Sequence, residues 1–269
     1  MYKLIALDMD GTLLRDDKTV SPAVFDAIQA AKAKGAKVVL ATGRPIKGVD
    51  KYLTHLNLKE AGDYVATFNG ALVQDTFTGD VISHITMNHD DLITIYEASR
   101  ELRTHVHFFD KNTLYTPNKD ISKFTVHEAF MNDVSLNYIN IEDVNKDIVI
   151  SKVMMIDYPE ILDRVVTELP KELVEKYTIV RSAPFFLEFL NIDANKGNGI
   201  MLLANKLGIK QEEVICVGDA GNDIHMVEYA GLGVAMGNAT DDLKAVANYI
   251  TKSNNEDGVA HVINEFILK

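Results

Sequence analysis

The sequence predicts an α/β fold: a core with a mainly parallel β-sheet, into which a smaller α+β module is inserted. At both ends of the 269-residue chain, short apolar runs alternate with helical patterns, which is typical of βαβ units. The middle of the chain combines helices and strands without this regular alternation. We therefore expect residues 1–84 and 191–269 to form the core. Residues 85–190 form the insertion, since domains are readily inserted at exposed loops.

The first part of the core follows the alternating pattern closely. Ser21 is a suitable N-cap and Pro22 a suitable first residue for a helix that ends at Gly35. The expected strands are Leu4–Leu7, Val38–Ala41 and Tyr64–Phe68, with a helix near Val49–Leu56 and a hairpin formed by Leu72–Gln74 and Val81–His84.

The remaining elements are expected on the same grounds. The insertion carries helical patterns near Asp90–Leu102 and Ile161–Leu169, and strand-like runs at His105–Phe109, Ile148–Ile156, Thr178–Val180 and Phe185–Leu190. The last part of the core alternates helices near Gly197–Leu207, Asp223–Tyr229 and Asp241–Val246 with strands at Val214–Val217, Gly233–Ala235 and Tyr249–Ile250.

Composition excludes several classes of protein. The formal net charge of −12 argues against binding to nucleic acid or to an anionic membrane. No apolar run is long enough to cross a bilayer. We expect no signal peptide, because the first apolar run stops at Asp8. A single cysteine, Cys216, cannot form an internal disulfide, so we expect a reducing, cytoplasmic location.

A first cluster of polar residues, Asp8-Met9-Asp10-Gly11-Thr12, directly follows the first expected strand. In such sheets ligands bind beyond the carboxyl ends of the strands. Asp8 and Asp10 are two residues apart, so an extended backbone turns both side chains to one face. Neighbouring carboxylates repel each other unless a cation or a proton joins them, and Mg²⁺ prefers oxygen ligands. The cluster favours a metal site, although a pair of acidic residues also occurs at strand ends without function.

Three further clusters lie near the ends of other expected strands. Thr42-Gly43-Arg44 offers a hydroxyl, a backbone N–H and a guanidinium, which suit a phosphoryl oxygen. Lys196 begins a helix, where its charge opposes the helix dipole, and such conflicts are expected at functional sites. Asp219 precedes the next helix, whereas Asp223 lies in its first turn and is also explained as a cap. Asp219 is therefore the better candidate for a metal ligand.

Together, these clusters resemble the four motifs of the haloacid dehalogenase (HAD) superfamily of phosphohydrolases. The matching segments are Asp8–Leu13, Thr42, Lys196 and Gly218–Asp223. The position of the insertion is similar to that of the C2 class of cap domains, and Phe68–Ala71 is similar to the Cof-type branch. Stretches of the insertion, Lys152–Asp157 and Ser182–Glu188, resemble a sugar phosphatase of that branch. The resemblance covers the whole chain and implies a Rossmann-like core with a C2 cap that sets specificity.

This resemblance implies a Mg²⁺-dependent phosphomonoesterase. Asp8 would attack phosphorus and form an aspartyl-phosphate, while Asp10 would act as general acid and then as general base. Asp8, Asp219 and the backbone carbonyl of Asp10 would hold Mg²⁺, supported by Asp223. The implied residues for binding the phosphoryl group and substrate are Met9, Thr42, Gly43, Arg44, Lys196 and Asn222.

Sugar phosphates are the leading expected substrates, and several alternatives stay open. The protein could instead be a phosphatase for a cofactor such as pyridoxal phosphate or flavin mononucleotide (FMN), or a hexose phosphomutase. Outside enzymes, it could be a phospho-receiver or a metal-binding regulator. Asp10 argues against a regulator, which gains nothing from a hydrolytic base. We expect a small-molecule phosphomonoester as substrate, no nucleic-acid or membrane partner, and a monomer or homodimer.

Overall fold

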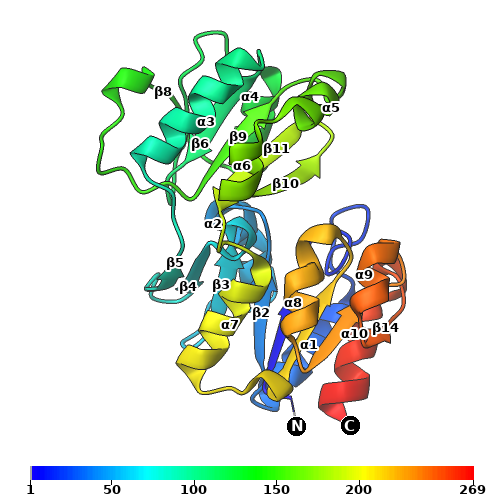
Figure 1. Ribbon diagram of the computed structural model, residues 1–269. Helices are drawn as coiled ribbons and strands as arrows, with labels where there is room; N and C mark the ends of the chain where they lie inside the picture. Colours follow the sequence, from blue (N-terminus) through cyan, green and yellow to red (C-terminus); the bar gives the residue numbers. More distant parts are fainter. Residues whose placement is uncertain (1) are drawn as a thin grey trace. The chain divides into compact units, whose positions relative to one another are not determined.

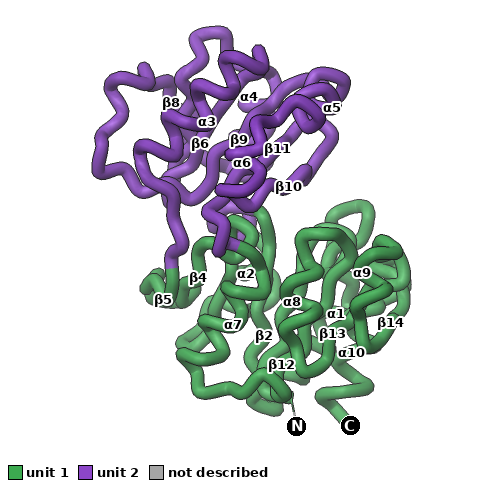
Figure 2. The backbone as a smooth tube through the Cα atoms, in the orientation of Figure 1, with its two compact units in different colours: residues 1–43, 51–83, 195–269 green, residues 44–50, 84–194 purple. Residues whose placement is uncertain are grey.

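The computed structural model describes residues 2–269, and the chain divides into two compact units (Figure 2). Unit 1 consists of Met1–Gly43, Lys51–Ser83 and Asn195–Lys269. Unit 2 consists of Arg44–Asp50 and His84–Ala194. The long segment of unit 2 therefore interrupts unit 1 in the sequence.

Unit 1 is built on an eight-stranded sheet with the order β14-β13-β12-β1-β2-β3-β4-β5. The strands from β14 to β3 are parallel, and β4 is antiparallel to β3. This confirms the expected α/β fold with a mainly parallel sheet. The strands are β1 Leu4–Leu7, β2 Lys37–Ala41, β3 Tyr64–Thr67, β4 Leu72–Asp75, β5 Val81–His84, β12 Val214–Gly218, β13 Leu232–Ala235 and β14 Tyr249–Ile250.

The order of the strands reverses at β1. The chain first adds β2 and β3 on one side of β1, and later adds β12, β13 and β14 on the other. Leu7, the last residue of β1, lies opposite Leu40 of β2 and Val217 of β12. The carboxyl ends of these three strands therefore meet at one edge, which is where α/β sheets bind ligands.

Helices connect the strands of unit 1 (Figure 1). The Ser21 side chain accepts a hydrogen bond from the Val24 N–H and Pro22 begins α1, as expected. Helix α1 packs against α10, and α7 against α8. Because the chain winds outward from β1 in both directions, right-handed crossovers place α1 and α8 on opposite faces of the sheet. The helices are α1 Pro22–Ala33, α2 Ile46–His55 (whose first residues belong to unit 2), α7 Lys196–Leu207, α8 Ile224–Tyr229, α9 Asp241–Val246 and α10 Gly258–Ile263. The short 3₁₀ turns are η1 Phe68–Gly70, η3 Gln211–Glu213, η4 Gly221–Asp223 and η5 Asn254–Glu256, and the chain ends in the π-helix η6 Asn264–Leu268.

Unit 2 contains a six-stranded sheet with the order β10-β11-β9-β6-β7-β8. Its pairs are antiparallel except for the parallel pair of β7 and β8. The strands are β6 His105–Phe109, β7 Leu114–Thr116, β8 Leu136–Tyr138, β9 Lys152–Ile156, β10 Tyr177–Ala183 and β11 Phe186–Asn191; the helices are α3 His89–Glu101, α4 Lys123–Met131, α5 Pro159–Glu168 and α6 Lys171–Lys176, with the turn η2 Ile141–Asp143.

The two faces of this second sheet differ in chemistry. On one face, residues such as Phe108 of β6 and Val153 of β9 are fully buried in an apolar core with residues of α3 and α5. On the opposite face, Lys152 is buried and its ammonium lies 3.2 Å from Glu188 and 3.4 Å from Glu128 of α4. Burial lowers the pKa of Lys152, but the two carboxylates outweigh this effect and raise it above the usual value.

Several elements differ from the sequence-based expectation. Strands β7 and β8 and helices α4 and α6 were not expected. They are short and lie in the insertion, which lacks the regular strand–helix alternation that indicated the equally short α9 and β14 in the core. The strand expected over Ile148–Ile156 is shorter and begins at Lys152, although Ile150 forms an isolated bridge with Met87. Within residues 2–269, no helix is long and apolar enough to cross a membrane.

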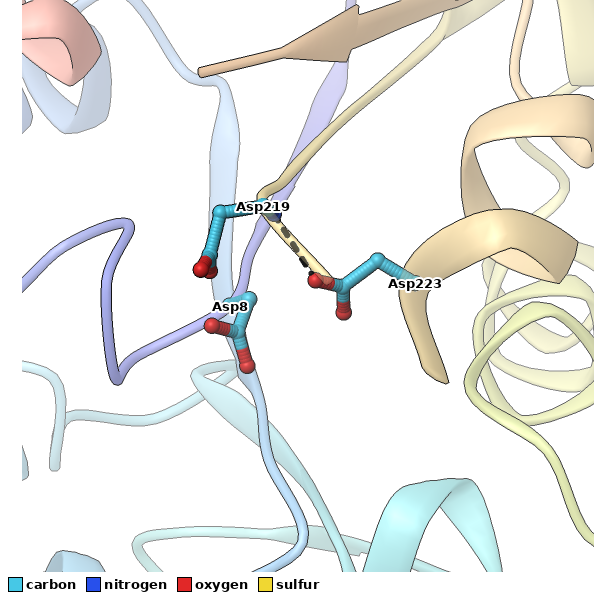
Figure 3. Close-up of side chains that lie close together, drawn as sticks. All are labelled: Asp8, Asp219 and Asp223. Atoms are coloured by element: carbon cyan, nitrogen blue, oxygen red, sulfur yellow. Dashed lines mark hydrogen bonds between the residues drawn. The ribbon is translucent and has the colours of Figure 1, made fainter. Parts of the chain in front are cut away.

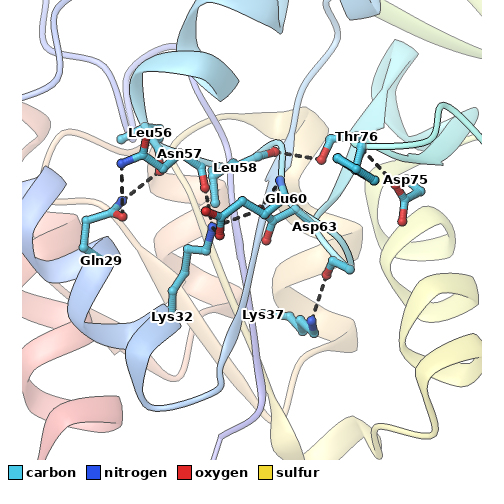
Figure 4. Close-up of polar contacts among 12 residues, drawn as sticks. Gln29, Lys32, Lys37, Leu56, Asn57, Leu58, Glu60, Asp63, Asp75 and Thr76 are labelled. Atoms are coloured by element: carbon cyan, nitrogen blue, oxygen red, sulfur yellow. Dashed lines mark hydrogen bonds and ion pairs between the residues drawn. The ribbon is translucent and has the colours of Figure 1, made fainter.

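Lys32 of α1 binds the loop between α2 and β3 at the amino edge of the sheet (Figure 4). Its ammonium donates to the Asn57 carbonyl, to Glu60 at 3.3 Å and to Asp63 at 2.9 Å. The Asp63 side chain is only 7% exposed. A carboxylate buried to this degree depends on its cation, because an unpaired buried charge strongly destabilises a fold. This edge lies opposite the carboxyl ends of the parallel strands, so we assign the network to stability.

The substitution Lys32→Met keeps an apolar side chain of similar length but removes the ammonium. Because Asp63 then stays buried without its cation, we expect the free energy of unfolding to fall by about 1–3 kcal/mol. Denaturant titration measures this change. The control is Lys171→Met, which removes an exposed ion pair with Glu175 and should change the free energy by less than about 1 kcal/mol. Equal losses in both variants would contradict the role of Lys32.

Candidate active site

Three carboxylates converge beyond the carboxyl ends of β1 and β12 (Figure 3). Asp8 follows β1 directly, Asp219 follows β12, and Asp223 ends the short turn η4. One carboxylate oxygen from each lies within 4.8 Å of the others. Asp223 is fixed by the backbone, because it accepts hydrogen bonds from the N–H groups of Asp219 at 2.9 Å and Ala220 at 3.0 Å. The chain thus brings together acidic residues that are more than 200 positions apart.

Lys196 enters this cluster from the first position of α7. Its ammonium lies 2.5 Å from Asp8 and 2.6 Å from Asp223, and the side chain is fully buried. The charge that conflicts with the helix dipole is therefore held by two carboxylates rather than by water. Three carboxylates and one ammonium still leave two negative charges uncompensated in the cluster.

Burial and the neighbouring charges both shift the pKa values of the cluster. Burial raises the pKa of Asp8 well above its usual value, and the charges of Asp223 and Asp219 add to the effect, while Lys196 opposes it. Burial also raises the pKa of Asp219. For Lys196, burial lowers the pKa, but Asp223 and Asp8 outweigh burial and raise it. The carboxylates thus favour a proton or a further cation among them.

The turn after Asp8 allows the two acidic segments to approach each other. Gly11 has a φ of +87°, and a Cβ atom at this position would lie 2.3 Å from an Asp219 carboxylate oxygen. Glycine is required here both for the left-handed backbone and for the space. The Thr12 hydroxyl donates to Asp219 at 2.8 Å and fixes the orientation of its carboxylate. Sequence analysis had not assigned a role to Thr12.

Asp10 occupies a different environment from Asp8. Its side chain is 42% exposed and accepts a hydrogen bond from Lys18 at 2.8 Å. The Asp10 carboxylate is therefore not among the three that converge, although the expected metal contact of Asp10 was its backbone carbonyl. Because its carboxylate is accessible, Asp10 can exchange a proton with water, whereas the buried carboxylate of Asp8 is shielded from solvent.

The structure gives local surroundings for other expected residues. Met9 is fully buried, and its carbonyl accepts from the Leu14 N–H at 2.8 Å. Thr42 directly follows β2 and is 2% exposed. The amide of Asn222 donates to Asn69 at 3.1 Å. Arg44, where the segment of unit 2 begins, donates to the Gly48 carbonyl at 3.5 Å.

The donors of the cluster fit a divalent cation such as Mg²⁺. They are all carboxylate oxygens, which hard cations prefer. The two uncompensated negative charges match the charge of one such ion. Asp8 and Asp219 are the best placed to bind it, because both oxygens of Asp223 already accept hydrogen bonds from Lys196 and from the backbone.

Comparison with known proteins gives a consistent result. The haloacid dehalogenase-like hydrolase family matches residues 5–263. The chain belongs to this family. YxeH of Bacillus subtilis (strain 168), which is named as a phosphatase, is 57% identical over 268 residues, covering 100% of this chain and 99% of the relative. The protein is a phosphatase of the HAD superfamily, as expected from its motifs.

Two other members of the family differ in their named substrates. YitU of B. subtilis (strain 168), a 5-amino-6-(5-phospho-D-ribitylamino)uracil phosphatase, is 31% identical and covers 98% of this chain and 97% of its own length. The structure of the HAD subclass IIB sugar phosphatase BT4131 superposes with a TM-score of 0.80 at 27% identity, covering 98% of each chain. The Cof-type branch expected for this HAD phosphatase agrees with such neighbours.

Addition of MgCl₂ should stabilise this HAD phosphatase, by about 2.7 kcal/mol when the ion is at 100 times its dissociation constant. Asp219→Asn removes one expected metal ligand and one repelling charge. We therefore expect the metal-free variant to be at least as stable as the metal-free wild type, but to lose the response to MgCl₂. Differential scanning calorimetry in EDTA and in MgCl₂ measures both effects.

The matched control is Asp241→Asn, an exposed aspartate in the first turn of α9. This variant should respond to MgCl₂ as the wild type does. If Asp219→Asn kept the full stabilisation by MgCl₂, the assignment of Asp219 as a ligand would be wrong.

Proposed function

We propose that this HAD phosphatase is a Mg²⁺-dependent phosphomonoesterase of small cytoplasmic metabolites, with sugar phosphates as the leading substrates. The observation that carries this proposal is the buried Lys196 ammonium between Asp8 and Asp223, at 2.5 and 2.6 Å. This arrangement puts a nucleophilic oxygen beside a fixed positive charge. Phosphoryl transfer depends mostly on such positioning and electrostatic stabilisation.

Asp8 is the proposed nucleophile. One of its oxygens attacks phosphorus, the bond from phosphorus to the leaving oxygen breaks, and an aspartyl-phosphate forms. Lys196 holds the attacked group through a phosphoryl oxygen and keeps Asp8 oriented. Asp8, Asp219 and the Asp10 carbonyl would hold Mg²⁺, supported by Asp223. When bound there, the ion would supply positive charge that favours the ionised form of Asp8 and offsets the negative charge of the substrate's phosphate.

Asp10 is the proposed general acid and base. It donates a proton to the leaving oxygen in the first step. In the second step a water oxygen attacks the phosphorus of the aspartyl-phosphate, Asp10 takes the proton of that water, and inorganic phosphate leaves with Asp8 regenerated. Asp10 is thereby protonated again at the end of the second step. Its side chain is 42% exposed, so it is accessible to the leaving group and to the attacking water, as this role requires.

The phosphoryl oxygens are bound by donors from four segments in this proposal. They are the backbone N–H groups of Met9 and Gly43 and the side chains of Thr42, Lys196 and Asn222, with Arg44 as a further contact for the substrate. The donors that belong to unit 1 contact only the phosphoryl group in this proposal, and not the leaving group. We assign the choice of leaving group to the inserted segment, residues 85–190, which we propose acts as the cap.

A second candidate function is hydrolysis of a phosphorylated cofactor or of another phosphomonoester with a ring-bearing leaving group. It is supported by the relative YitU, which is named for a substrate that joins a phosphorylated ribityl chain to a uracil ring. The same phosphoryl chemistry at Asp8 serves both candidates, so they differ only in the leaving group.

The substitution Asp8→Asn should lower kcat by at least about 10³-fold, because it removes the attacking oxygen's charge while keeping the size of the side chain. Steady-state release of phosphate from p-nitrophenyl phosphate in MgCl₂ measures the loss. Asp26→Asn, an exposed aspartate of α1, is the control and should leave kcat unchanged. A folded Asp8→Asn variant with near wild-type turnover would exclude Asp8 as the nucleophile.

The substrate class is tested by phosphate release from a panel of hexose and pentose phosphates, FMN, pyridoxal phosphate and 5-amino-6-(5-phospho-D-ribitylamino)uracil, in MgCl₂ and in EDTA. We expect the highest kcat/KM for a sugar phosphate and no turnover in EDTA. A higher kcat/KM for a ring-bearing substrate would favour the second candidate. Isomerisation of hexose phosphates without release of phosphate, or a phospho-aspartate without repeated turnover, would contradict both.

A further inference from the structure

The turn after β3 contains a buried asparagine in an unusual conformation. Phe68, Asn69 and Gly70 follow one another with φ values of +50°, +53° and +84°. Asparagine adopts this left-handed region more readily than most residues, because its short polar side chain can bond locally. Asn69 is only 3% exposed, so its amide must find partners inside the protein.

These partners belong to the segments that we assign to phosphoryl binding. The Asn69 N–H donates to the Thr42 carbonyl at 2.9 Å. The side-chain oxygen of Asn69 accepts from the amide of Asn222 at 3.1 Å. A Cβ atom at Gly43 would lie 3.1 Å from the Asn69 amide nitrogen, so the side chain packs directly on the Gly43 backbone. Asn69 thus touches two segments that lie about 180 positions apart.

The same turn also packs against the helix that begins with Lys196. A Cβ atom at Gly70 would lie 2.3 Å from the Asn195 carbonyl oxygen, and one at Gly199 would lie 2.9 Å from the Gly70 Cα atom. The position of Asn69 is therefore set by tight backbone contact with α7, and not by the amide alone.

We propose that Asn69 is a positioning residue, which orients the Asn222 amide toward a phosphoryl oxygen. This inference rests on the proposed function, in which Asn222 and the Thr42-Gly43 segment bind the phosphoryl group. An amide carries two N–H groups in one plane. Since one N–H of Asn222 donates to Asn69, the direction of the other is set before the substrate binds. Donors arranged in advance stabilise a charged group more effectively than donors that must reorganise.

The substitution Asn69→Gly separates this role from the turn itself. Glycine tolerates a positive φ and keeps the N–H that donates to Thr42, but it lacks the amide. We expect the dissociation constant of inorganic phosphate in MgCl₂, measured by titration calorimetry, to rise about tenfold, the effect of losing one well-oriented hydrogen bond to a charged group. For p-nitrophenyl phosphate, KM should rise more than kcat falls.

The matched control is Asn57→Gly. Asn57 also has a left-handed backbone, with a φ of +52°, but it lies in the loop between α2 and β3 and donates to Gln29. This variant should bind phosphate as the wild type does. If Asn69→Gly does not fold, Asn69→Ala replaces it, because alanine also removes the side-chain oxygen that accepts from Asn222 but leaves the unfolded chain less freedom than glycine does. This variant should weaken phosphate binding as much as Asn69→Gly.

A double-variant cycle tests whether Asn69 acts through Asn222. The variant Asn69→Gly with Asn222→Ala should bind phosphate within about twofold of Asn222→Ala alone, since coupled residues are not additive. The inference would be overturned if the two substitutions raised the dissociation constant by factors that multiply in the double variant. An unchanged dissociation constant in the Asn69 variants would overturn it as well. If the wild type neither binds phosphate nor hydrolyses any phosphomonoester, the proposed function itself fails. If the wild type does both and Asn69→Gly is unchanged, only the role of Asn69 fails.

Discussion

The site depends on one electrostatic arrangement, the Lys196 ammonium held between Asp8 and Asp223. A fully buried ammonium is costly unless carboxylates compensate it, and carboxylates packed this closely repel each other without a cation. Each group therefore makes the burial of the others possible. Because the carboxylates outnumber the ammonium, the cluster is incomplete without further positive charge. This imbalance suits a site that must accept a metal ion and a phosphate dianion.

The arrangement requires the backbone to come unusually close at several points. Gly11 lets the first segment approach Asp219, and Gly70 lets the turn after β3 pack on the start of α7. Phe68 and Asn69 adopt left-handed conformations beside Gly70, at a cost of about 1–2 kcal/mol for each non-glycine residue. A strained turn persists only where the surrounding packing compensates for it, and such turns are concentrated at functional sites.

In the proposed function, the chemistry and the choice of substrate belong to different parts of the chain. Every member of the carboxylate and ammonium cluster comes from unit 1. A phosphoryl group is the same in all phosphomonoesters, so a core that binds only this group cannot distinguish sugar phosphates from phosphorylated cofactors. The inserted segment has its own apolar core and its own sheet. It can therefore change in sequence without disturbing the carboxylates.

The sequence by itself determined the parallel sheet and drew attention to Asp8, Lys196 and Asp219. Strand patterns are local, and these residues stand out because their charges conflict with their neighbours or with a helix dipole. Only the tertiary structure decided that Asp10 lies beside Lys18, and that Asn69 contacts Asn222. A contact such as that between Asn69 and Asn222 joins segments far apart in the chain. It depends on backbone approaches of a few ångströms, which no local pattern of residues encodes.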